Sequence, residues 1–132
     1  MKYTDDSALP EVDVQELQAA LAGTRPYTVV VLKAGPHYSP PGPARDPEVA
    51  AIILRHGVRN MRLRLAGLLR VVCPIADGSE LAGVGVFDAT PEECDAIYSR
   101  DPAVMASVLT YEIHPTRTFP QSNLAEESLF RS

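Results

Sequence analysis

One histidine stands out among the residues that could carry out chemistry. His56 falls in the run 46–67, which reads as one long helix. At about 100° per residue it shares a helix stripe with Val49, Ile52, Ile53 and Leu63. Burial there disfavours the charged imidazolium, and a neutral imidazole with a carboxylate neighbour is a general base. The alternative is a core histidine hydrogen-bonded to a backbone carbonyl.

Two arginines are candidates for holding an anion beside that base. Arg59 lies three residues after His56, and Arg70 lies on the next expected strand. Either could stabilise an enolate or a carboxylate. The alternative is that both are solvated, since Arg55, Arg59 and Arg62 form a charged helix face.

Two further side chains could border a substrate. His37 lies in a proline-rich loop after the first expected strand, where it is either exposed to solvent or part of a lid over a pocket. Tyr111 alternates onto the apolar face of the last expected strand, which predicts a core residue whose hydroxyl could reach a cavity. The three histidines and two cysteines show no metal-ligand spacing, so no metal site is predicted.

Length, composition and charge exclude several classes of protein. The 132 residues suit one domain with a real core, and the 45% hydrophobic and 22% charged shares are those of a soluble globular protein. A net charge of −5 argues against nucleic acid as the main partner. No apolar run is long enough to span a bilayer, so we expect no membrane partner and a cytoplasmic location. Cys73, in an apolar run, is expected in the core.

Hydrophobic periodicity and capping residues place the expected elements. Strands are predicted at 27–34, 68–73, 83–87 and 108–114, and helices at 10–22, 46–67 and 91–100. Asp46-Pro47 and Thr90-Pro91 pair an N-cap with a proline at the first helical position. Asp101-Pro102 repeats this device, so Asp101 is most simply an N-cap, and Asp77-Gly78 is a turn signal.

The order of these elements is an extra helix followed by β-α-β-β-α-β. This order predicts the α+β ferredoxin-like fold, a four-stranded antiparallel sheet with both helices on one face. A second copy of the chain is the simplest cover for the other face, so we expect a homodimer. Residues 1–26 form an extension with a short helix, 27–119 the domain, and 120–132 a polar tail.

The long helix carries a second apolar stripe, formed by Leu54, Val58, Met61 and Leu65. A surface helix needs only one such stripe, so both faces should be covered. The second stripe could meet a partner subunit, or the N-terminal helix through Val14, Leu17 and Leu21. We expect the intramolecular contact, in which case deletion of residues 1–22 would expose Met61 and promote aggregation.

From residue 27 to residue 119 the chain resembles a YCII-related domain. The matching features are His56, Gly67-Leu68-Leu69, Cys73-Pro74, Asp77, the strand 83–87, Asp101-Pro102, and the strand end Tyr111-Glu112-Ile113-His114-Pro115. Their order and spacing carry the resemblance. Cys73 stands where the family has a glycine before the proline, and the N-terminal helix and proline-rich loop exceed the family's minimum.

The resemblance implies a ferredoxin-like unit that dimerises through its sheets into an α/β barrel. It also implies a histidine–aspartate pair, which maps to His56 and Asp77. A few relatives are dehydrochlorinases acting on hydroxylated, chlorinated aromatic rings, and related barrels include muconolactone isomerases and small monooxygenases. Fold alone does not decide which reaction is performed.

If Asp77 accepts a hydrogen bond from one ring nitrogen of His56, it fixes the tautomer and raises the basicity of the other nitrogen. We therefore expect a cofactor-independent lyase or isomerase acting on a small, aromatic or enolisable substrate, with His56 and Asp77 as the catalytic pair. Two alternatives stay open: a non-catalytic small-ligand-binding or accessory protein with the same barrel, and a monooxygenase-like barrel acting on polyphenols, which would also need no cofactor.

Overall fold

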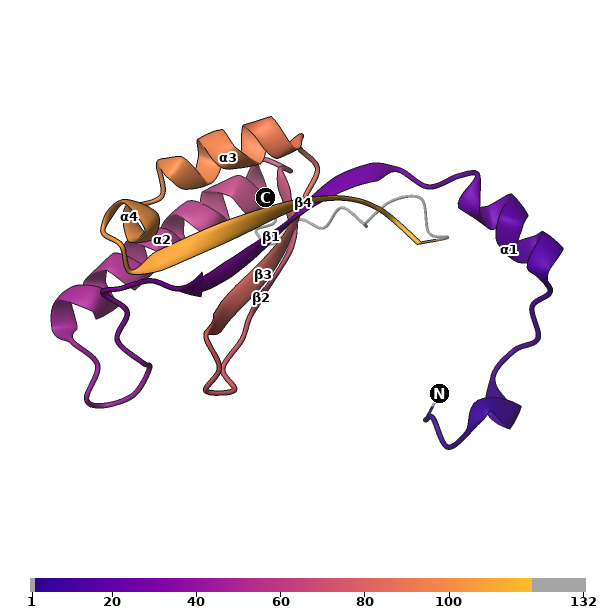
Figure 1. The fold of residues 1–132 in the computed structure, drawn as a ribbon, viewed down its shortest axis with the longest axis horizontal. Helices are drawn as coiled ribbons and strands as arrows, with labels where there is room; N and C mark the ends of the chain where they lie inside the picture. Colours follow the sequence, from indigo (N-terminus) through magenta and orange to yellow (C-terminus); the bar gives the residue numbers. More distant parts are fainter. Residues whose placement is uncertain (1, 120–132) are drawn as a thin grey trace, which may run out of the picture.

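An open antiparallel sheet with helices on one face positions the rest of the molecule (Figure 1). The computed structural model describes residues 2–119. Its elements in chain order are the 3-10 helix η1 (Asp6–Ala8), α1 (Val14–Leu21), β1 (Pro26–Ala34), α2 (Pro47–Leu65), β2 (Leu69–Pro74), β3 (Leu81–Phe87), α3 (Pro91–Ser99), α4 (Pro102–Met105) and β4 (Leu109–Arg117). The expected order of helices and strands is confirmed.

The four strands lie in the order β2-β3-β1-β4, and each neighbouring pair is antiparallel. This arrangement is compatible with the predicted ferredoxin-like fold. β4 continues through Pro115 to Arg117, three residues beyond the expected end. Proline lacks an N–H donor and is tolerated on an edge strand, and β4 pairs only with β1 in this sheet.

The core lies between the sheet and the helices α2, α3 and α4. Its buried side chains include Val30, Ile52, Leu69, Phe87 and Tyr98. The Phe87 and Tyr98 rings meet edge to face, with centroids 5.6 Å apart. Each large side chain buried here contributes roughly 1.5–3 kcal/mol to folding. The apolar stripe predicted for the long helix therefore packs on the sheet as expected, with His56 among its buried residues.

Side-chain caps fix where the helices begin. Asp46 accepts a hydrogen bond from the Glu48 amide at 2.8 Å and starts α2. Thr90 and Glu93 form the reciprocal capping box of α3. Asp101 accepts from the Ala103 amide at 2.9 Å and starts α4. The predicted caps are therefore confirmed.

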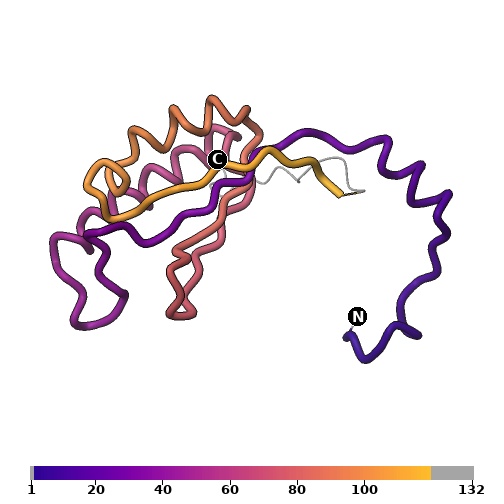
Figure 2. The backbone as a smooth tube through the Cα atoms, viewed as in Figure 1, coloured from indigo at the N-terminus to yellow at the C-terminus, as the bar shows by residue number. Residues whose placement is uncertain are grey.

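The N-terminal helix does not pack on α2, so the expected intramolecular contact is wrong. Figures 1 and 2 show residues 2–25 projecting away from the body as an arm, and α1 contains no buried residue. The outer stripe of α2 stays open, with Leu54 71% and Val58 64% exposed. The base of the arm is held to the end of β4, where Arg117 donates to the Thr24 hydroxyl and carbonyl at 3.0 and 2.7 Å.

The two cysteines occupy opposite environments, and the core position expected for Cys73 is wrong. Cys73 lies on the edge strand β2 and is exposed, whereas Cys94 on α3 is fully buried. Burial is the largest influence on the Cys94 thiol and raises its pKa to about 11. The predicted apolar run 68–73 thus lies half on the core and half at the sheet margin.

We expect one thiol per folded chain to react rapidly with a disulfide reagent such as Ellman's reagent at pH 8. Thiolate is the reactive form, so the exposed Cys73 reacts while the buried Cys94, with its raised pKa, does not. Stopped-flow absorbance measures the number of fast equivalents. The variant Cys73→Ser should show none until denaturant is added, and two fast equivalents in the native protein would contradict the assignment.

Candidate active site

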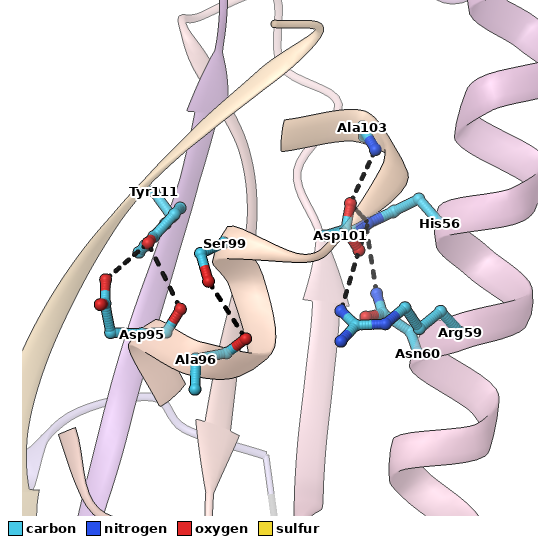
Figure 3. A network of polar contacts seen from close by, with 9 residues as sticks. All are labelled: His56, Arg59, Asn60, Asp95, Ala96, Ser99, Asp101, Ala103 and Tyr111. Carbon is cyan, nitrogen blue, oxygen red and sulfur yellow. Dashed lines mark hydrogen bonds and ion pairs between the residues drawn. The ribbon is translucent and has the colours of Figure 1, made fainter. Parts of the chain in front are cut away.

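A buried histidine–carboxylate pair joins α2 to the start of α4 (Figure 3). The His56 Nδ1 atom lies 2.8 Å from Oδ2 and 3.0 Å from Oδ1 of Asp101. The side chain of His56 is 11% exposed, and that of Asp101 is fully buried. An ionised carboxylate only accepts hydrogen bonds, so Nδ1 carries the proton and donates it to Asp101. The other ring nitrogen, Nε2, is left with its lone pair.

Asn60 lies one helical turn after His56 and contacts that second nitrogen. Its Nδ2 atom is 3.2 Å from Nε2 of the imidazole, a distance at which the amide donates to the ring lone pair. The Asn60 Oδ1 atom is buried and has no hydrogen-bond partner among residues 2–119. Nε2 of His56 is thus a proton acceptor whose hydrogen bond from Asn60 a substrate can replace.

Asp101 is stabilised in its charged form despite its burial. Desolvation on its own would raise the pKa of this carboxyl, but the hydrogen bond and charge of His56 and the backbone amides of Ala103 and Val104 outweigh it and lower the pKa. Arg59 adds a longer contact, with its Nη1 atom 3.7 Å from Oδ2. The carboxylate therefore remains ionised at neutral pH and can orient the ring.

The lowered pKa of Asp101 predicts how stability depends on pH. A carboxyl with a lower pKa in the folded state contributes stability above its unfolded value of about 3.9 and loses that contribution as the pH falls through the folded value. Urea unfolding of the wild type and of Asp101→Asn from pH 7 to pH 3 should therefore give stabilities that converge below about pH 4. A constant difference across that range would contradict the charge assignment.

A pocket of about 460 Å³ adjoins this pair, with His56 and Asn60 in its wall. Five parts of the chain line it: α2, the proline-rich loop 35–46, the β2–β3 hairpin, and single residues of β1 and β4. The remaining lining residues are Leu32, Tyr38, Pro41, Arg45, Ile53, Gly57, Met61, Arg64, Val72, Pro74, Ile75, Ala76, Ala82, Gly83 and Leu109. A volume of this size suits a small organic molecule.

The hydrogen bond expected between His56 and Asp77 is not formed. Both ring nitrogens of His56 are already engaged, by Asp101 and by Asn60. Asp77 lies in the exposed β2–β3 turn, where its carboxylate accepts from the Ser79 amide at 3.0 Å. Hydrogen bonding by the Ser79 side chain, and then by this amide, lowers the pKa of Asp77. The orienting acid is thus the residue that was predicted only to be a helix cap, and Asp77 is the turn residue that its Asp-Gly sequence indicates.

The other predicted site residues lie around the pocket rather than in its wall. Arg59 contacts the carboxylate of Asp101. Arg70 is 7% exposed and donates to the Gly67 carbonyl at 3.2 Å. Tyr111 packs against the core as expected, but its hydroxyl donates to Asp95 at 2.6 Å on the outer side of α3 (Figure 3). His37 is exposed, and its Nδ1 atom lies 3.1 Å from the Ala106 carbonyl.

Four charged or amide-bearing residues of the pocket wall or the His56–Asp101 pair were not predicted from the sequence as functional. Asn60 could have been found from helical spacing, because it lies four residues after His56 and residues i and i+4 share one helix face. Asp101 was marked by its Asp-Pro pair, but a capping aspartate has a second oxygen that sequence spacing cannot direct. Arg45 and Arg64 border the pocket from a loop and from the last turn of α2. A loop of irregular backbone gives no periodicity from which Arg45 could be placed.

No known family model matches this chain, and no curated protein matches it either. Among residues 2–119, no three His, Cys, Asp or Glu side chains gather closely enough to hold a metal ion. The helices in that range include none of the length and apolar character needed to cross a bilayer. The function must therefore be argued from the site itself.

Proposed function

We propose that this protein is a cofactor-independent lyase or isomerase in which His56 is the general base and Asp101 its positioning residue. One observation carries the proposal: a buried imidazole, oriented by a buried carboxylate, forms part of the wall of a pocket. The expected resemblance to YCII-related domains favours the same class of reaction, although its aspartate is then Asp101 rather than Asp77.

The proposed reaction begins with proton transfer from a carbon acid or a phenol of the substrate to Nε2 of His56. Asp101 stabilises the imidazolium that results, because its carboxylate already accepts the Nδ1 proton. The electron pair left on the substrate then either takes a proton at another carbon, which is an isomerisation, or expels a leaving group, which is an elimination. Both outcomes are redox-neutral and balance without a further reactant.

Base catalysis alone typically supplies about 10²–10⁴-fold, so the charge that develops on the substrate needs its own stabilisation. The Asn60 amide is placed for this role because its donor already lies 3.2 Å from Nε2. When a substrate occupies the pocket, the Asn60 N–H group can donate its hydrogen bond to the substrate oxygen instead of to the ring. The largely apolar wall strengthens such a hydrogen bond by excluding water.

We further propose that two chains associate through the sheet face opposite the helices, as the resemblance implies. Val30 and Leu32 of β1 point into the core, so their neighbours Val29 and Val31 point to the other face. A shallow hollow on that face is lined by Tyr27, Val29 and Val86, with Phe119 beside them. Apolar side chains on an otherwise open sheet favour a cover, and a second copy supplies one.

A second candidate function is a non-catalytic binder of small molecules. The observation that favours it is that Nε2 already receives a hydrogen bond from Asn60, so the ring is satisfied without a substrate. Such a protein would hold its ligand in the same pocket without changing any bond. The two candidates differ in one measurable respect, which is whether a substrate proton exchanges with water.

The test is deuterium incorporation followed by proton NMR in D2O. The panel consists of unsaturated lactones, 2-oxo acids and ring-hydroxylated aromatic acids, each incubated with the protein and without added cofactor. We expect at least one class to exchange a carbon-bound proton faster than in buffer, with exchange removed by His56→Asn and kept by His114→Asn, which alters an exposed imidazole. Saturable binding of the panel with no exchange in any member would support the binder instead.

A further inference from the structure

The pocket carries two positive charges and no negative one in its wall. Arg45 enters from the proline-rich loop and Arg64 from α2, and no aspartate or glutamate lines the pocket. We propose that the pocket selects molecules with an apolar body and a carboxylate, which one of these two arginines binds. The proposal rests on the proposed function, because it names the substrate class of that enzyme. Its test measures binding alone.

Arg45 is held in place before any ligand arrives. Its Nε atom donates to the Ser39 carbonyl at 2.9 Å, and its Cζ atom lies 5.6 Å from the centre of the Tyr38 ring. These contacts use one edge and one face of the guanidinium and leave the Nη groups for a ligand. A guanidinium positioned in this way loses little freedom when it binds a carboxylate.

Arg64 is half-buried, and within residues 2–119 no acidic side chain pairs with it. Arg59, the neighbouring arginine on α2, has the carboxylate of Asp101 as its partner. A partly desolvated cation without a counter-charge favours an anionic ligand, because the ligand supplies the missing charge. Planar carboxylates match the paired donors of arginine in two parallel hydrogen bonds.

The rest of the wall suits a ring or a short hydrocarbon body. Leu32, Ile53, Met61, Ala82 and Leu109 contribute apolar side chains to it. A ligand bound with its body among them and its carboxylate at one of the two arginines would extend toward the imidazole, because His56 lies between Arg45 and Arg64 along the chain. The arginine and the apolar wall would then orient the molecule for proton transfer.

Benzoate and its neutral isostere benzamide are the probes for this proposal. In an NMR titration, benzoate should shift the methyl signals of Ile53 and Met61. Benzamide should bind at least about tenfold more weakly than benzoate. The double variant Arg45→Gln/Arg64→Gln should weaken benzoate binding by about ten- to a hundredfold. The matched control is Arg55→Gln/Arg62→Gln, which removes two arginines of α2 that lie outside the pocket wall.

Equal binding of benzamide and benzoate would overturn the proposal. So would the absence of shifts at the pocket methyl groups, or an equal loss of affinity in the control pair. The variant His56→Asn should keep benzoate binding, because the imidazole does not hold the carboxylate. Selective benzoate binding without any proton exchange would therefore leave this inference standing while the proposed enzyme function fails.

A different observation concerns the projecting arm and the open stripe of α2. In α1 the side chains Val14, Leu17 and Leu21 share one face, and no residue of α1 is buried. On α2 the outer stripe Leu54, Val58, Met61 and Leu65 is at least 40% exposed at every position. We infer that the arm of one chain packs its apolar face on this stripe of a second copy.

Charge supports a second copy of the same chain as the occupant. Residues 2–23 carry five acidic side chains and one basic one, whereas residues 54–65 carry four arginines and no acid. The arm is thus complementary to α2 in charge as well as in hydrophobicity. An acidic helix is repelled by anionic lipid headgroups, which argues against a membrane surface as the partner.

The link between α1 and β1 favours contact with another copy over a fold-back within the chain. Only residues 22–25 separate the two elements, and Thr24 and Arg25 are bound to the end of β4. Ala22 and Gly23 continue the last turn of α1 through the hydrogen bond from Gly23 to Ala20. Reversing the chain onto its own α2 would break these bonds, whereas exchange between two copies keeps them and makes the contact reciprocal.

The docked arm would also complete the site, because Met61 belongs to both the stripe and the pocket wall. The test uses mixed samples of Cys73→Ser protein. One chain carries ¹³C-methyl methionine, and the other carries Ala19→Cys with a nitroxide spin label on α1. We expect the Met61 methyl signal to broaden in the mixture and the exposed Met105 methyl signal to stay sharp.

Leu17→Ser in the spin-labelled chain should abolish the broadening, whereas Gln15→Ser, on the other face of α1, should retain it. Added salt should weaken the effect, because arm and stripe are oppositely charged. Broadening of the Met61 signal only when the nitroxide and the ¹³C-methyl methionine are on the same chain would overturn the proposal. It would show that the arm folds back onto its own α2. Equal effects on Met61 and Met105, or none on either, would also overturn the inference.

Discussion

Replacement of His56 by asparagine is expected to lower turnover by about 10²–10⁴-fold with little loss of folding stability. The asparagine amide can occupy the place of Nδ1 and continue to donate to Asp101, so the buried carboxylate keeps its hydrogen bond. No group remains at the position of Nε2 to accept a proton. The measurement is the rate of substrate proton exchange, together with the thermal unfolding midpoint of the variant.

The control for this prediction is Asp77→Asn, which changes an exposed turn residue outside the pocket wall. That variant should keep the wild-type rate. Equal rates in the wild type and His56→Asn would make His56 a structural residue of the core. A loss of rate in Asp77→Asn would restore the histidine–aspartate pair that the sequence resemblance implied.

Asp101→Ala is expected to be the most destabilising single change at the site, at about 3 kcal/mol. The carboxylate caps α4, and loss of an N-cap costs about 1 kcal/mol. It also accepts the buried Nδ1–H of His56, and a hydrogen bond to a charged group contributes about 1.5–3 kcal/mol. For a domain of this size the unfolding midpoint should fall by roughly 10 °C.

Urea unfolding of Asp101→Ala and Asp101→Asn separates the two roles of this side chain. Asparagine caps helices about as well as aspartate, so the second variant should lose less stability than the first. Both should lose turnover, because neither can hold the imidazole in the required tautomer. Wild-type turnover in Asp101→Asn would show that the carboxylate serves the fold alone.

Much of the fold follows from local signals that the sequence carries in full. The caps at Asp46, Thr90 and Asp101 and the alternation along 108–114 are properties of neighbouring residues, and the structure confirms them. The burial of His56 followed in the same way from helical spacing. Local pattern was insufficient at the edge of the sheet. The apolar run predicts a core position for Cys73, but β2 is an edge strand and Cys73 is exposed.

The site was predicted only in part, because its partners lie far apart in the chain. His56 and Asp101 are 45 residues apart, and only the packing of α4 on α2 decides that they meet. The resemblance to YCII-related domains favoured Asp77, whose side chain is bonded within its own turn. Arg45 depends on the course of a proline-rich loop, which has no repeating pattern to predict it.

Asp101 performs two tasks: its Oδ1 atom caps the α4 backbone, and both carboxylate oxygens lie within hydrogen-bond distance of the imidazole. Since α4 spans only Pro102–Met105, it is too short to persist once its cap is released. Local melting of this single turn would free the ring to rotate while the sheet remained paired. On heating, turnover should therefore be lost at a lower temperature than strand pairing. Circular dichroism of the sheet would then overestimate the temperature range in which the protein is active.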